Sequence, residues 1–201
     1  MKRISYVLCA LLISASICAQ EENQTKYQPK FGFNLGVNQS ELYNSDASDE
    51  LTIDNGYGFR LGVFAELPIA GRWSVHPKAE LSFNNDYVTQ DDQRYRVDPY
   101  NLNFMTHINF DFKSWSKNVH PVGYIGPSVR VPLTREFDGV TYDTKAAFAL
   151  DFAFGYRIDV EWFYITPMLR YSAGLTDIRS EPFGETLRGS YASFMIAFTG
   201  K

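Results

Sequence analysis

Eight stretches in which apolar and polar residues alternate constrain this chain more than any other feature of it. In the clearest, residues 73–83, the odd positions are Trp, Val, Pro, Ala, Leu and Phe, and the even positions are Ser, His, Lys, Glu and Ser. A strand sends successive side chains to opposite faces, so this strand has one apolar face and one charged face. The eight predicted strands are residues 31–39, 57–67, 73–83, 100–112, 121–133, 146–156, 162–172 and 191–199.

The connections between these strands alternate in length. Long polar connections cover residues 40–56, 84–99, 134–145 and 173–190, and short ones cover 68–72, 113–120 and 157–161. Bacterial outer-membrane barrels have an even number of strands, short periplasmic turns and long outer loops. The pattern therefore predicts an all-β fold, an eight-stranded antiparallel up-and-down transmembrane β-barrel over residues 31–201, with both termini periplasmic.

The apolar face is expected to lie toward lipid. Hydrocarbon offers no water to backbone groups, so only helices and closed barrels can cross it. The architectural rival is a soluble exported barrel of the lipocalin kind, which needs the apolar face inside. In that arrangement Arg60, Lys78, Glu80 and Arg170 would face water.

Residues 1–19 are typical of an export signal, with a positive start, an apolar run and small residues near the end. Cleavage there leaves a periplasmic tail, residues 20–30, and predicts the outer membrane of a Gram-negative bacterium as the location. Lipidation of Cys18 is the alternative, although Ile17 is larger than the residue expected before a lipidated cysteine. Because Cys9 and Cys18 both lie in the leader, the remaining chain can form neither a disulfide scaffold nor a thiolate metal site.

The composition limits the classes of molecule that this chain is expected to bind. The net charge of −4 and the lack of basic runs argue against nucleic acid. An aromatic content of 16% suits belts at the two membrane interfaces. The expected partners are outer-membrane lipid, lipopolysaccharide and, during insertion, the barrel-assembly machinery, whose C-terminal signal the last strand resembles. Three prolines lie within predicted strands, and a β-bulge is expected at one or more of them: Pro77, Pro127 and Pro167.

Several short motifs resemble the PorT-type outer-membrane β-barrel family of Bacteroidota. They are KFGFNLG at 30–36, GYGFRLG at 56–62, YIGPS at 124–128 and RYSAGLTDI at 170–178. The resemblance implies an eight-stranded barrel similar to the OmpA and OmpX type, in a family where most members have no assigned activity. The family name comes from a component of a secretion and gliding apparatus.

Charged residues recur on the inward face, and an eight-stranded barrel has an interior that side chains just fill. A salt-bridged plug is therefore expected, with Lys78 paired to Asp151 or Glu80 and with His76, His107 and Asp111 close by; a proton or small-ion path is the alternative. The predicted lumen charge network is Arg60, Glu66, Lys78, Glu80, Arg130, Asp151 and Arg170.

No catalytic or metal site is predicted, and no cofactor. The histidines point into the lumen mid-strand or start a strand on the periplasmic side, and no Ser–His–acid set gathers at the outer rim. No cluster has zinc spacing, and the acidic loops lack the spacing of a calcium loop. Aromatic and arginine residues are enriched at binding hot spots. The predicted loop partner surface is accordingly Tyr87, Arg94, Tyr95 and Arg96.

These features predict a small non-enzymatic integral outer-membrane protein with a filled lumen, whose loops serve envelope integrity or partner binding. Two alternatives remain open. One is a component of a secretion or gliding apparatus, and the other is a lipid A-modifying barrel enzyme.

Overall fold

The computed structural model describes residues 28–44, 52–90, 93–97, 99–112, 118–133, 136–137, 140–141, 145–179 and 186–201. The predicted export signal and most of the predicted tail lie outside them. Eight long strands make up the barrel: β1 (Lys30–Asn44), β3 (Tyr57–Ala70), β4 (Trp73–Phe83), β7 (Tyr100–Asp111), β8 (Val119–Pro132), β11 (Ala147–Asp159), β12 (Phe163–Gly174) and β14 (Thr186–Gly200). Six short strands lie in the connections: β2 (Thr52–Asp54), β5 (Asp86–Gln90), β6 (Gln93–Val97), β9 (Glu136–Phe137), β10 (Val140–Thr141) and β13 (Ile178–Arg179).

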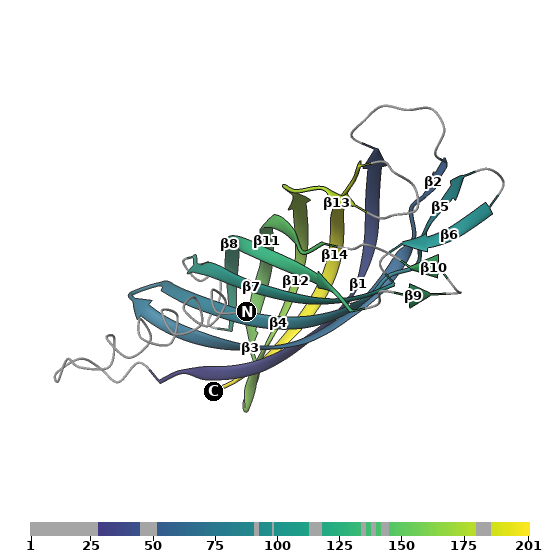
Figure 1. Cartoon of the computed structure of the whole chain (residues 1–201). Helices are drawn as coiled ribbons and strands as arrows, with labels where there is room; N and C mark the ends of the chain where they lie inside the picture. The colour runs from purple at the N-terminus through teal and green to yellow at the C-terminus, as the bar shows by residue number, and fades with distance from the viewer. Residues whose placement is uncertain are drawn as a thin grey trace.

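The long strands form a closed barrel in which each strand pairs antiparallel with the next, in the order β1-β3-β4-β7-β8-β11-β12-β14 (Figure 1). Closure comes from β1 and β14, which pair from Gly32 with Thr199 through to Asn44 with Leu187. The start of β1 and the end of β14 are therefore at the same end of the barrel. This confirms the predicted eight-stranded antiparallel fold.

Predicted strand ends differ from the observed ones mainly where polar residues continue a strand. The strand at 73–83 has the predicted bounds, whereas β1 runs on to Asn44 and β14 already begins at Thr186. The prediction that 157–161 is a connection was wrong in part, because β11 continues to Asp159. Arg157 therefore lies within a barrel strand, in phase with the inward residues Asp151 and Ala153.

The three strand prolines do not produce the predicted bulges. Pro77 pairs with Thr106, Pro127 with Leu150 and Pro167 with Ile196, each on one side only. On the other side the pairing lapses and resumes in the same register, since proline has no N–H to donate to the ladder. Within the described strand pairs, the recorded register shift lies elsewhere, between Pro68 and Ala70.

The turn between β3 and β4 requires a glycine at position 71. Gly71 has a φ of 57°, in the left-handed region that glycine adopts without a steric cost. It joins Ala70 to Arg72 and allows β4 to start at once with Trp73. This is the tightest of the short turns that define one end of the barrel, called the turn end below.

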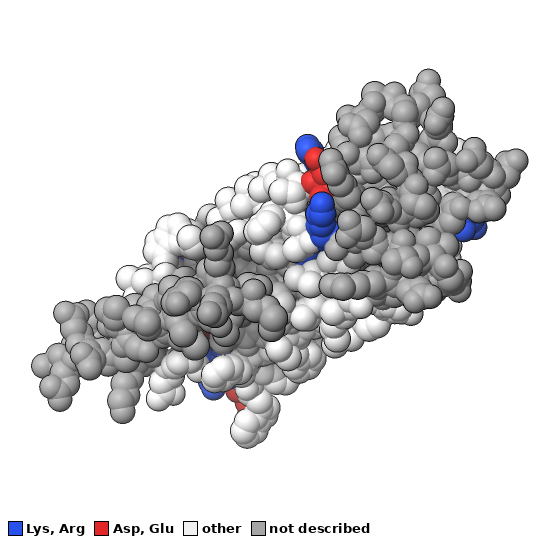
Figure 2. Space-filling view, viewed as in Figure 1, with Lys and Arg blue, Asp and Glu red and all other residues white. Residues whose placement is uncertain are grey.

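The two faces of the barrel wall differ as the alternation requires. Polar and charged side chains point inward and are buried, while large apolar side chains point outward and are exposed. On the face of the molecule shown in Figure 2, the described charged residues lie toward the two ends of the barrel wall. The wall between them carries no charged residue on this face. The lipocalin-like alternative is therefore excluded, because it needs the opposite orientation. Exposed large apolar residues along the first two barrel strands include Phe31, Phe33, Leu35, Val37, Tyr57, Phe59, Leu61 and Val63.

The opposite end, called the loop end below, carries structure that the sequence pattern did not predict. Within the connections 40–56 and 84–99, strands β2, β5 and β6 form a three-stranded sheet beyond the barrel (Figure 1). A small apolar cluster of Leu42, Val88 and Leu187, with Ile53 packed against it, joins this sheet to the ends of β1 and β14. Among the described residues, no helix is long and apolar enough to cross a membrane.

Candidate functional site

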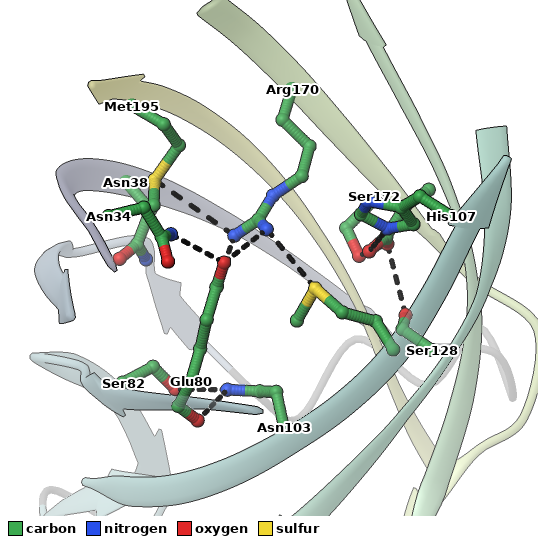
Figure 3. A network of polar contacts seen from close by, with 12 residues as sticks. Asn34, Asn38, Glu80, Ser82, Asn103, His107, Ser128, Arg170, Ser172 and Met195 are labelled. Atoms are coloured by element: carbon green, nitrogen blue, oxygen red, sulfur yellow. Dashed lines mark hydrogen bonds and ion pairs between the residues drawn. The ribbon is translucent and has the colours of Figure 1, made fainter. Parts of the chain in front are cut away.

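The middle of the lumen is crossed by an ion pair between Arg170 on β12 and Glu80 on β4. The guanidinium donates from Nη1 to Oε1 at 2.9 Å and from Nη2 to Oε2 at 2.7 Å. Asn34 Nδ2 also donates to Oε1, at 2.6 Å (Figure 3). Both charged side chains are almost fully buried, 2% exposed for Arg170 and 0% for Glu80. Such two-point pairing is the strongest form that a carboxylate and a guanidinium adopt.

A glycine makes room for this pair. Gly62 on β3 is the cross-strand partner of Glu80. A Cβ at this position would lie 2.4 Å from Cγ of Glu80, closer than any side-chain carbon tolerates. The alternation of glycine with large apolar residues on β3 thus leaves space on the inner face for a side chain from β4.

A second buried carboxylate, Asp151 on β11, is surrounded by three side chains. Nε2 of His107 lies 3.0 Å from Oδ2, and Ser128 donates to Oδ1 at 3.0 Å. Ser172 also donates to Oδ1 (Figure 3). Both hydroxyls are thus bonded to the carboxylate and not to a histidine nitrogen, so this cluster does not activate a serine as a nucleophile.

The third cluster lies near the turn end, where Arg157 bridges two strands. It donates from Nη1 and Nη2 to the two oxygens of Glu66, at 3.1 and 2.9 Å, and from Nη1 to Asp111 at 3.2 Å. His76 Nε2 lies 4.0 Å from Glu66 Oε2 and 2.9 Å from the hydroxyl of Ser74. Arg157 was absent from the predicted network because its stretch was assigned to a connection, although its odd position matched the inward phase of Asp151 and Ala153.

Lys78 sits between aromatic rings rather than carboxylates. Its Nζ lies 5.0 Å from the ring centre of Tyr124 and 5.3 Å from that of Phe64. Glu80 pairs with Arg170 and Asp151 pairs with His107, so the expected pairing of Lys78 with one of these carboxylates is not what the structure has. Cation–π contact provides its stabilisation instead.

Two further arginines meet at the loop end of the lumen. The guanidinium carbon of Arg130 lies 3.9 Å from the ring centre of Tyr191, and that of Arg60 lies 5.0 Å from the same centre. All seven residues of the predicted charge network are buried. Four of them form ion pairs: Glu66, Glu80, Asp151 and Arg170. Lys78 lies between two aromatic rings, and Arg60 and Arg130 both lie at the ring of Tyr191.

The predicted loop partner surface lies on the β5–β6 hairpin. The guanidinium of Arg94 lies 4.0 Å from the ring centre of Tyr87 and 3.2 Å from a carboxylate oxygen of Asp54 on β2. Arg96 instead turns back and donates to the carbonyl of Asn84, at 2.6 and 3.2 Å. Of Tyr95 only the backbone is described, and it pairs with Val88.

The part of the chain that the structure describes contains no group of three or more His, Cys, Asp or Glu residues able to hold a metal ion. His76 and His107 are buried in the lumen, away from the outer surface of the barrel. The arrangement can therefore fill the lumen and hold the strands together through buried ion pairs.

The fold and this polar interior agree with one family. The model of the outer membrane protein beta-barrel domain matches residues 18–180, and the chain belongs to that family. It is an integral outer-membrane β-barrel protein. No curated protein matches the sequence.

Two solved structures are similar in fold. Neisserial surface protein A (NspA) has a TM-score of 0.54 at 12% identity, over 83% of this chain and 95% of that one. The outer membrane protein OprG from Pseudomonas aeruginosa has a TM-score of 0.56 at 14% identity, over 86% of this chain and 93% of that one. At such identities the likeness shows the shared barrel alone.

Proposed function

We propose that this protein is a non-enzymatic outer-membrane barrel with a closed lumen, which acts through the surface at its loop end. The observation that carries the proposal is the contrast between the two regions. Buried ion pairs cross the lumen at successive levels, whereas the loop end carries an extra sheet that a small apolar cluster joins to the barrel strands β1 and β14.

The closed lumen follows from the energetics of buried charge. Opening a water path past Arg170 or Arg157 would require breaking a two-point ion pair whose partners are both buried. Removing one partner of such a pair costs about 3–5 kcal/mol. Because breaking either ion pair has a high free-energy cost, the wild-type barrel is expected to pass no steady ion current.

The partner surface is proposed on the sheet of β2, β5 and β6. The ion pair of Arg94 with Asp54 is more than half exposed, at 57% and 52% of the two side chains. Exposed pairs of this kind contribute little stability, about 0–1 kcal/mol. Together with the ring of Tyr87 they offer aromatic and guanidinium groups on paired strands, which suits recognition of a protein or of lipopolysaccharide.

Site-specific photo-crosslinking in living cells tests this proposal. A crosslinker at Tyr87 is expected to give a discrete product that Arg94→Glu abolishes, while one at Trp162, exposed at the turn end, gives a different pattern or none. The proposal is wrong if purified wild-type protein shows steady single-channel conductance in planar bilayers. It is equally wrong if Tyr87 gives no product dependent on Arg94.

The resemblance of residues 170–178 to the PorT type supports a second candidate, a component of a secretion or gliding apparatus. In that case the Tyr87 product would contain another envelope protein, and the deletion strain would fail to secrete its substrates. A normal secreted protein profile in the deletion strain would exclude this role.

A further inference from the structure

Near the loop end, the lumen contains two arginines that form no ion pair with a carboxylate. Arg60 is 2% exposed and Arg130 is 5% exposed. Among the ion pairs within the described residues, neither appears, although the other buried arginines, Arg157 and Arg170, are each bonded at two points. In Arg60 the buried Nε and Nη2 atoms have no hydrogen-bond partner, and in Arg130 the buried Nε has none.

Arg60 and Arg130 come from strands that are not neighbours in the barrel, and both lie close to the aromatic ring of Tyr191. Arg60 is on β3 and Arg130 on β8, and both guanidinium groups lie within 5.0 Å of the ring centre of Tyr191 on β14. Stacking on a tyrosine stabilises a guanidinium but leaves its in-plane N–H groups free to donate. The two cations are thus held near each other while donors of both stay available.

The pair stands at the mouth of the barrel. Arg130 pairs across the sheet with Ala147, the first residue of β11, and Arg60 pairs with Ser82, the last residue but one of β4. On β3, Arg60 lies one inward position nearer the loop end than Gly62, which is the cross-strand partner of Glu80. Ser193, whose buried hydroxyl lacks a partner, is the cross-strand neighbour of Arg170 on the adjacent β14.

Two carboxylates, those of Glu80 and Asp86, interact electrostatically with these arginines, but neither forms an ion pair with them. Glu80 interacts electrostatically with Arg60, but both of its oxygens are bonded to Arg170. Asp86 interacts electrostatically with both arginines; its Oδ1 accepts from Ser40 and from the backbone N–H of Gly56, and its buried Oδ2 has no hydrogen-bond partner. Two buried cations with unused donors are costly unless an anion compensates them.

We infer that Arg60 and Arg130 form a binding site for a phosphate-type oxyanion at the loop-end mouth of the lumen. Guanidinium groups match the oxygens of a phosphate through paired N–H donors, which lysine cannot do. The ligand would be free phosphate or the phosphate group of a larger molecule, such as the head group of an envelope glycolipid.

Calorimetric titration of the purified protein in a non-ionic detergent tests the site. The probes are inorganic phosphate and glucosamine 1-phosphate, each against sodium chloride at equal ionic strength. Saturable phosphate binding is expected, with affinity at least about tenfold lower in Arg130→Gln, the loss that one charged hydrogen bond implies. Arg72→Gln, which removes an exposed arginine in the turn between β3 and β4, is the matched control and should bind like the wild type.

Two further variants keep the test decisive. Arg130→Lys retains the charge and should fold even if Arg130→Gln does not, yet it should bind phosphate more weakly than the wild type. Asp86→Asn removes a carboxylate that interacts with both arginines and should tighten binding. A preference for glucosamine 1-phosphate would assign a glycolipid head group, and equal or better binding of inorganic phosphate would assign the free ion.

Other outcomes would overturn the inference. They are the absence of saturable binding to the wild type, or equal binding by the wild type, Arg130→Gln and Arg130→Lys. In those cases Asp86 would be the counter-ion of the two arginines, and Asp86→Asn would lower the unfolding temperature without affecting phosphate.

Discussion

Arg157 and Glu66 stand 91 positions apart in the chain and form a two-point ion pair near the turn end of the lumen. The pair connects β11 with β3, which are not neighbours in the barrel order. It therefore joins opposite parts of the wall in a way that no strand pairing does. Its side chains are only 7% and 6% exposed.

Replacing Arg157 by Leu should destabilise the barrel by about 3–5 kcal/mol, because Glu66 would be left as an uncompensated buried charge. The measurement is the free energy of unfolding by urea in lipid vesicles. The double variant Arg157→Leu/Glu66→Leu should recover much of the loss, since neither charge then remains. Arg94→Leu, in an exposed pair, should change stability by no more than about 1 kcal/mol. Equal effects of Arg157→Leu and Arg94→Leu would contradict the buried role.

The central ion pair should control whether ions pass. Arg170→Ala with Glu80→Ala removes both halves of the pair and leaves no unpaired charge between them. We expect the double variant to show ion conductance in planar bilayers where the wild type shows none, because water can enter the vacated space. Ser172→Ala, also in the lumen, is the control and should stay closed. A silent double variant would mean that other side chains suffice to close the lumen.

Replacing an outward apolar side chain by a charged one should lower the stability of the barrel in the membrane. Leu61→Arg and Phe152→Arg place a cation on the lipid-facing wall, and each should cost about 2–4 kcal/mol if the residue lies near the bilayer centre. Tyr57→Arg, at the first residue of β3, should cost about 0–1 kcal/mol because it lies near the interface. Heat-modifiable migration on a gel, with and without boiling, reports insertion. A normal shift for Leu61→Arg together with loss of folding on a lumen substitution would reverse the assignment of inside and outside.

Asp86, in the loop-end sheet beyond the barrel strands, should make stability depend on pH. Burial raises the pKa of its carboxyl above the ordinary value of 3.8, although bonds from Ser40 and Gly56 oppose the shift. The folded state therefore holds this proton more tightly than the unfolded state. The stabilisation is complete below about 3.8 and is lost as the pH rises through the raised pKa of the folded protein.

Hydrogen exchange of the β5 amides over a pH series checks this prediction, in a buffer without phosphate. After correction for intrinsic exchange, protection should decline as the pH rises above 3.8 in the wild type. Asp86→Asn should flatten the dependence, because the amide does not titrate. A wild-type profile that matched the variant would show that Asp86 ionises as it does in the unfolded chain.

The sequence by itself determined the number of barrel strands, their antiparallel order and which face of each is apolar. Residues 73–83 show why, since a period of two is a local pattern that exists only if one face meets an apolar medium and the other a polar one. The connection lengths supplied the rest, because outer-membrane barrels have short turns at one end and long loops at the other. Both signals can be seen along the chain without knowing which distant residues meet.

Only the tertiary structure decided which charges meet. Glu80 and Arg170 are 90 positions apart, and His107 and Asp151 are 44 apart, so no local pattern links them. Alternation placed these side chains on the inner face, but the partner of each depends on the height that strand register gives it in the lumen. The same reason applies to the β2–β5–β6 sheet, whose residues are polar and aromatic and resemble an ordinary loop until Val88 is seen against Leu42 and Leu187.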